Sequence, residues 1–193
     1  MKAVLDTCVL YPPVTRAVLI AAAEVGILTP LWSDGILAEW VHTAARHHGD
    51  AGAVSAQGDI TLLNARFPSA LIPQDAALQA ALWLPDRNDI HVLATAITGQ
   101  SDTIITLNLK DFPKRTLAPH GVSAIHPDVV LTRFLAHHPN SIIGILERLY
   151  HNITGGFIKV GLETPPPLRT LLKRAHLPRF GKAVSKMLPT ADD

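Results

Sequence analysis

Five acidic or amide residues stand at the ends of apolar segments or within helical patterns: Asp6, Glu39, Asp86, Asp89 and Asn108. If they meet at one place, their carboxylates repel one another unless a cation lies between them. Oxygen ligands without an obligatory histidine or a set of cysteines favour Mg²⁺, with Mn²⁺ as a substitute. Such an ion can activate water for attack on phosphorus, so these residue types indicate hydrolysis of phosphodiesters.

Each of these residues also has a structural interpretation. Asp86, Asp89 and the nearby Asp75 stand at the starts of helical patterns, where the helix dipole favours a carboxylate without any metal. Asp6 directly follows an apolar strand pattern, and Glu39 has apolar neighbours in its helix, so both carboxylates need a partner. The joint occurrence of the acids favours one shared site.

The elements that must position these residues are short strands that alternate with helices. Apolar and β-branched runs predict strands at residues 2–5, 27–32, 70–72, 103–107 and 122–125. Apolar periodicity, prolines and capping residues predict helices near residues 12–26, 33–41, 54–66, 75–82 and 85–99. The alternation predicts an α/β fold, a parallel sheet sandwiched by helices, whose ligands bind beyond the carboxyl ends of the strands.

After residue 126 only helical patterns remain. They cover residues 127–136 and 141–151, stop at Gly155-Gly156, and resume after Pro165–Pro167 and after Pro178. We therefore expect two domains, an α/β domain of residues 1–126 and an all-helical C-terminal extension of residues 127–193. The first carries 8 basic and 11 acidic residues, net −3, and the second 9 and 5, net +4. This asymmetry suits either a polyanionic partner for the extension or an ordinary solvated helical surface.

Composition limits the class of protein. Hydrophobic residues make up 48% and charged residues 17% of the chain, which is typical of a globular protein. The single cysteine, Cys8, excludes an internal disulfide framework and a multi-cysteine zinc site. No apolar run reaches the roughly 18 residues of a membrane span, and the N-terminus lacks a signal-peptide pattern. We expect a cytoplasmic protein without a membrane partner.

Four segments together resemble the motif regions of PIN-domain nucleases, VapC-type toxins in particular: LDTCVLYP, SDGILAEW, LPDRNDIHVLATAI and IITLNLKDFP. They occur in the family's order within residues 1–126. The resemblance implies a PIN-like fold and a Mg²⁺-dependent endoribonuclease that is the toxin of a bacterial type II toxin–antitoxin pair. It also implies that Asp6, Glu39 and Asp89 bind the metal, that Asp86 is an additional acid, and that Asn108 replaces a fourth aspartate.

The same resemblance implies partners: a tRNA or ribosomal RNA substrate, a cognate antitoxin protein and, since PIN domains commonly dimerise, a second copy of the chain. The helical extension resembles that of a longer subgroup of VapC-type toxins. Its basic residues are then candidates for contacts with the RNA backbone, with solubility as the alternative role: Arg169, Lys173, Arg174, Arg179, Lys182 and Lys186.

Two departures from the family pattern leave alternatives open. Cys8 stands where an asparagine often follows the first aspartate, and Asn108 brings no negative charge, although its carbonyl can still bind or orient a water. Asp111 can replace it only if the local loop allows. The chain is thus either an active nuclease or a catalytically silent PIN-like domain that binds RNA or protein. Cys8 also excludes a haloacid-dehalogenase-like phosphatase, which needs an aspartate at that position.

Overall fold

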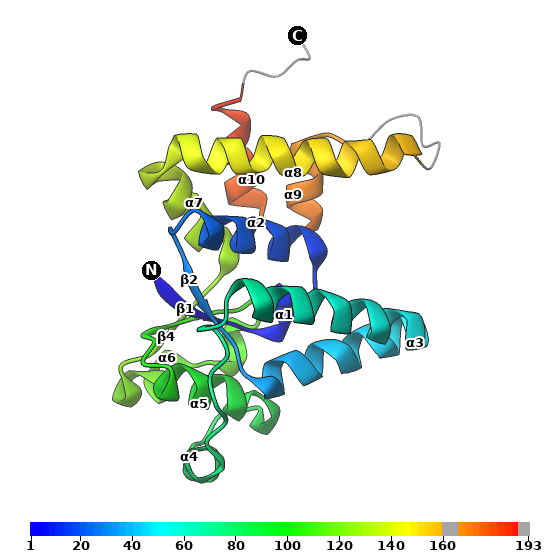
Figure 1. The fold of residues 1–193 in the computed structure, drawn as a ribbon. Coiled ribbons are helices and arrows are strands. Elements are labelled where there is room, and N and C mark those ends of the chain that lie inside the picture. The colour runs from blue at the N-terminus through cyan, green and yellow to red at the C-terminus, as the bar shows by residue number, and fades with distance from the viewer. Residues whose placement is uncertain (160–165, 189–193) are drawn as a thin grey trace. The chain divides into compact units, whose positions relative to one another are not determined.

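The computed structural model describes residues 1–159 and 166–188, with side chains for residues 1–152 and 166–188. The predicted α/β class is confirmed, because a four-stranded parallel sheet forms with the order β2-β1-β3-β4 (Figure 1). Its strands are β1 (Lys2–Leu5), β2 (Thr29–Leu31), β3 (Thr103–Ile105) and β4 (Ser123–Ile125). Each lies within a run for which the sequence predicts a strand.

The register of the two central strands sets up the site. Leu5 pairs with Ile105, and both side chains are fully buried. The next residues, Asp6 and Thr106, therefore emerge side by side at the carboxyl edge of the sheet, where the Asp6 N–H donates to the Ile105 carbonyl at 3.2 Å. A buried strand that ends in a polar residue thus delivers that residue to this edge.

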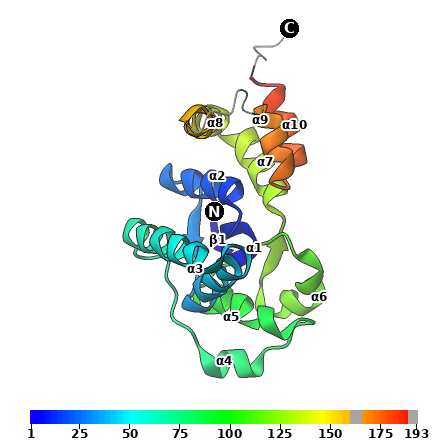
Figure 2. The same ribbon diagram turned by 90° about the vertical axis from the view of Figure 1, so that its right-hand side faces the viewer.

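Residues 1–11 and 29–126 form one compact unit. Its helices are α1 (Thr7–Leu10), α3 (Asp34–Arg66), α4 (Ala76–Ala81), α5 (Ile90–Thr98) and α6 (Lys114–Leu117), with 3₁₀ turns η1 (Arg87–Asp89), η2 (Leu109–Asp111) and η3 (Ala118–His120). Helix α5 contacts β1 and β3, and α3 contacts α1 and α5 (Figure 2). These contacts bring the starts of α3 and α5 to the polar edge of the sheet.

Three details of this unit differ from the prediction. The helices predicted at 33–41 and 54–66 are two parts of α3, which is interrupted where Gly49 adopts φ +62°, a conformation that glycine tolerates. Residues 70–72 form only an isolated parallel bridge between Leu71 and Trp32. Pro85 does not start a helix, because Asp86 caps η1 and α5 begins at Ile90.

A second compact unit contains residues 12–28 and the chain from residue 127 onward. Its helices are α2 (Pro13–Glu24), α7 (Pro127–His137), α8 (Pro139–Lys159), α9 (Leu168–Arg174) and α10 (Pro178–Ser185). Helix α2 contacts α8 and α9, and the hydroxyl of Thr15 donates to the carbonyl of Ala175 at 3.0 Å. Residues 12–28 therefore group with the C-terminal helices, and the division into domains at residue 126 stays a prediction.

The predicted helical character after residue 126 is confirmed in the described residues. The predicted break at Gly155-Gly156 is wrong, because α8 continues through both glycines to Lys159. Pro165, the expected start of the next helix, lies outside the described residues, and α9 begins after Pro167.

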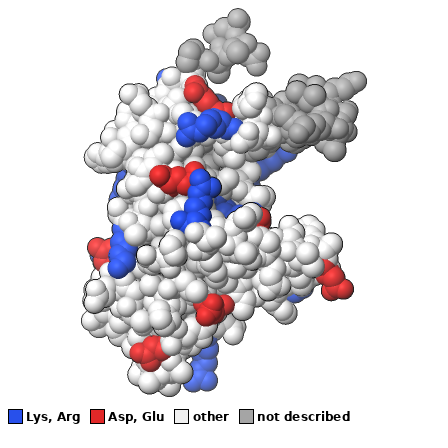
Figure 3. Space-filling view, viewed as in Figure 1, with Lys and Arg blue, Asp and Glu red and all other residues white. Residues whose placement is uncertain are grey.

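On the face seen in Figure 3, charged side chains are sparse, and several of opposite charge lie next to each other. In the parts of the chain that the structure describes, no helix has the length and apolarity to span a bilayer.

Candidate metal centre

Asp6 is a buried carboxylate held in one orientation. Only 5% of the residue is exposed, and its Oδ2 accepts hydrogen bonds from the Thr106 hydroxyl at 2.6 Å and the Cys8 thiol at 3.0 Å. The backbone N–H of Asn108 in turn donates to the Thr106 hydroxyl oxygen at 2.9 Å. Because both side-chain donors address Oδ2, Oδ1 is left for another ligand.

Cys8 takes part as a hydrogen-bonding group. Its sulfur lies between Asp6 and the backbone N–H of Leu107, which donates to it at 3.1 Å. Burial and the negative charge of Asp6 raise the pKa of the Cys8 thiol far above its usual range. The thiol is therefore a poor nucleophile, and it supports the orientation of Asp6.

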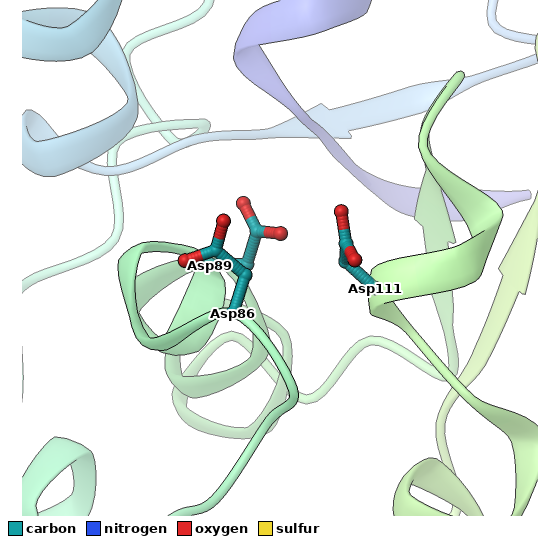
Figure 4. Close-up of side chains that lie close together, drawn as sticks. All are labelled: Asp86, Asp89 and Asp111. Carbon is teal, nitrogen blue, oxygen red and sulfur yellow. The ribbon is translucent and has the colours of Figure 1, made fainter.

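Three carboxylates converge in front of this edge (Figure 4). One oxygen from each of Asp86, Asp89 and Asp111 lies within 4.8 Å of the others. Asp86 and Asp89 come from the turn before α5, and Asp111 comes from η2, which follows β3. In Figure 4 their carboxylates face a common space. We call these three residues the aspartate cluster.

The electrostatics of the cluster fit a divalent cation. Burial, together with the charges of Asp6, Asp86, Asp111 and Glu39, raises the pKa of Asp89 from 3.8 to about 7. The Oδ2 atom of Asp89 is also buried without a hydrogen-bond partner among the described residues. A buried oxygen with no donor, beside four other carboxylates, is suited to a positive ion, and hard oxygen donors suit Mg²⁺ or Mn²⁺.

Asp86 has a second role that the sequence allowed. Its Oδ1 accepts from the backbone N–H of Asn88 at 2.9 Å, so it caps η1 while it belongs to the cluster. Asp75 caps α4 through the N–H of Leu78 at 2.9 Å and belongs to no such group. The capping interpretation is thus sufficient for Asp75 but not for Asp86.

Asn108 and Asp111 lie side by side at the edge of the cluster. The side-chain amide of Asn108 donates to Oδ2 of Asp111, and the ammonium group of Lys110 lies 3.9 Å from the same oxygen. Asn108 therefore orients Asp111, which supplies the carboxylate. The only sequence signal was an aspartate three residues beyond the asparagine, and the 3₁₀ turn η2 between them determines that it faces the cluster.

Glu39 lies at the border of the site. The expectation that its carboxylate sits among apolar neighbours is wrong, because 46% of the side chain is exposed. The buried hydroxyl of Thr7 donates to Oε2 of Glu39 at 2.9 Å and is shared with the carbonyl of Ile36 at 3.1 Å. Glu39 is not one of the three clustered acids, but its charge acts on Asp89.

The four-stranded parallel sheet with acids at its carboxyl edge agrees with a comparison of the sequence with known protein families. The profile of the PIN domain family matches residues 2–110, more than half of the chain, and the chain belongs to this family. Among curated proteins it is similar to one from Mycobacterium tuberculosis (strain ATCC 25618 / H37Rv) that is named as a ribonuclease, VapC50. The two are 48% identical over 104 residues.

That alignment covers 53% of this chain and 57% of the relative, so it spans just over half of the relative's length. Among solved structures, one of VapBC2 from Rickettsia felis, bound to a DNA fragment from their promoter, matches with 21% identity. It covers 65% of this chain and 98% of the other, with a TM-score of 0.46.

Proposed function

We propose that this PIN-domain protein is a metal-dependent endoribonuclease and the toxin of a toxin–antitoxin pair. The observation that supports this most directly is the aspartate cluster, in which the buried Oδ2 of Asp89 has no hydrogen-bond partner among the described residues. The similarity to a protein named as a ribonuclease, VapC50, supports the choice of RNA as the substrate.

Asp6, Glu39, Asp86 and Asp89 are the proposed metal-binding residues, and Asp111 joins them. When bound, Mg²⁺ or Mn²⁺ activates water and stabilises the charge that develops on the phosphate. Thr106 and Cys8 keep Asp6 oriented through Oδ2. Asn108 keeps Asp111 oriented, so it acts indirectly.

The proposed substrate is a tRNA or ribosomal RNA, with α9 and α10 as additional contacts to its phosphates. All six predicted cations of this segment are exposed, and residues 166–188 contain no acidic residue: Arg169, Lys173, Arg174, Arg179, Lys182 and Lys186. Replacing Lys173, Lys182 and Lys186 by glutamine should lower RNA affinity and flatten its salt dependence, since each phosphate contact releases counterions. The matched control replaces the exposed Lys2, Lys114 and Arg115 of the first compact unit by glutamine. An equal effect there would refute this role of the C-terminal helices.

The proposed protein partners follow from the VapC-type resemblance. We expect an antitoxin that blocks the acidic edge, and a second copy of the chain in a homodimer. Size-exclusion chromatography with light scattering tests the dimer, and inhibition of cleavage by the product of a neighbouring gene tests the antitoxin.

The experiment that tests the activity is incubation of total bacterial RNA with purified protein and Mg²⁺, Mn²⁺ or EDTA. We expect discrete fragments that need the metal and disappear in the Asp6→Ala and Asp89→Asn variants. Asp75→Asn is the control, since it removes an exposed acid outside the cluster. Folded protein that binds RNA without cleaving it under any condition would favour the silent RNA-binding alternative.

A further inference from the structure

The start of α3 and the first two turns of α5 lie close together. The hydroxyl of Thr95 donates to the hydroxyl oxygen of Ser33 at 2.9 Å, across the two helices. Four residues earlier on α5, the ring of His91 lies against Gly35 of α3. A Cβ atom at position 35 would lie 3.3 Å from Cδ2 of that ring and 2.9 Å from the side-chain nitrogen of Gln74. Glycine at position 35 therefore permits the approach of the imidazole.

The Nε2 atom of His91 has no hydrogen-bond partner among the described residues, although it is buried. The carboxylate oxygen Oε2 of Glu39 lies 3.7 Å from this nitrogen. This separation exceeds a hydrogen bond, and it is too short for a bridging water, which would hold the two atoms about 4.6 Å apart. A buried donor without a partner is costly, so a small rotation of the Glu39 carboxylate toward Nε2 is favourable.

A rotation of the Glu39 carboxylate would determine which of its two oxygens is held by hydrogen-bond donors. Thr7 holds the same oxygen, Oε2, but shares its single proton with the Ile36 carbonyl. Glu39 has no hydrogen bond through Oε1 within the described part of the chain. Two donors that converge on one oxygen would fix the plane of the carboxylate and leave Oε1 available to the cluster.

We propose that His91 is a positioning residue for Glu39, donating its Nε2–H to Oε2 while Thr7 donates to the same atom, so that Oε1 is presented to the metal site. Gly35 contributes because it has no Cβ atom, which lets the His91 ring pack against α3. The inference rests on the proposed function, since it assigns Glu39 to the metal site. Donors to the outer oxygen of a metal-binding carboxylate change affinity by about 10- to 100-fold when they are lost.

The test measures the Kd for Mn²⁺ by isothermal titration calorimetry, without RNA, in His91→Leu, His91→Gln, Gly35→Ala and Gly58→Ala. We expect His91→Leu to weaken binding by about tenfold. His91→Gln keeps a side-chain N–H and should recover most of this loss. Gly35→Ala moves the ring by a few tenths of an ångström without removing the donor, so it should weaken binding by about threefold, less than the loss of the donor does.

Gly58→Ala is the matched control on the same helix, because a Cβ atom there meets nothing within 4 Å. It should leave the Kd unchanged. Thermal melting of the metal-free proteins distinguishes a positioning role of His91 from a packing role. If His91 only packs, both His91→Leu and His91→Gln lower the Tm, and His91→Gln does not recover the Kd.

Wild-type affinity in His91→Leu would overturn the inference, as would a Gln variant that binds no better than the Leu variant. If His91→Leu does not fold, Gly35→Ala decides, and a Kd equal to that of Gly58→Ala would refute the role of the ring. The Asp89→Asn variant tests the metal site separately from the role of His91. If Asp89→Asn binds Mn²⁺ with the wild-type Kd, the proposed metal site itself is wrong. If Asp89→Asn loses binding while the His91 and Gly35 variants keep the wild-type Kd, only the role of His91 is wrong.

Discussion

Asp89 makes a prediction about the stability of the metal-free protein. Its pKa of about 7 in the folded state lies above the ordinary value of 3.8. Between pH 4 and pH 7 the folded protein therefore holds a proton that the unfolded chain has released. The stability from this proton is complete at low pH and is lost as the pH rises through 7. Asp89→Asn removes the titration, so the variant should be more stable than the wild type at pH 8.

The magnitude follows from the size of the shift. A change of about three pKa units corresponds to about 4 kcal/mol between the two protonation states. Because Asp89 is only half buried, solvent screening reduces this contribution, and we expect about 1–2 kcal/mol. For a chain of this size, that difference corresponds to a rise in Tm of about 3–6 °C.

The assay is thermal or urea unfolding from pH 4.5 to 8.5 in EDTA, followed by circular dichroism. The difference between Asp89→Asn and the wild type should grow with pH and level off above pH 7. Asp50→Asn, an exposed change on α3 outside the cluster, is the control and should follow the wild-type curve. If Asp89→Asn is no more stable than the wild type at pH 8, burial and the neighbouring carboxylates do not destabilise ionised Asp89, and the prediction is refuted.

Three further predictions concern the same site. Mn²⁺ affinity should be about tenfold weaker at pH 6 than at pH 8, because below pH 7 the metal must displace a proton from Asp89, and calorimetry in two buffers checks this. Asp111→Asn should weaken Mn²⁺ binding more than Asn108→Ala, since Asp111 supplies the carboxylate; the reverse order would restore Asn108 as the ligand. Thr106→Val should cost about 1–3 kcal/mol in urea unfolding, because buried Asp6 loses its 2.6 Å hydrogen bond, and a loss below 0.5 kcal/mol would contradict this.

The sheet and the acids at its edge could be predicted because the signals are local. An apolar run that ends in Asp6 identifies a buried strand with a polar end, and the three-residue spacing of Asp86 and Asp89 places both acids in the turn that precedes α5. Residue type and spacing were sufficient at these positions, since a parallel sheet brings the carboxyl ends of its strands together.

The remaining features depend on contacts that the sequence does not display. Whether Asn108 or Asp111 faces the cluster depends on the 3₁₀ turn between them. The exposure of Glu39 depends on which face of α3 meets α1 and α5. The grouping of residues 12–28 with the C-terminal helices includes a hydrogen bond between Thr15 and Ala175, 160 residues apart. Local propensity contains no information about such pairs.

The central claim is that Asp86, Asp89 and Asp111, together with Asp6 and Glu39, hold a divalent cation. Anomalous diffraction from crystals grown with Mn²⁺ tests it most directly, because the signal locates the ion without reference to activity. We expect a peak between the three aspartates, about 2.0–2.3 Å from at least one oxygen of Asp89. An ion bound elsewhere, or an empty cluster in crystals at pH 8 with millimolar Mn²⁺, would contradict it.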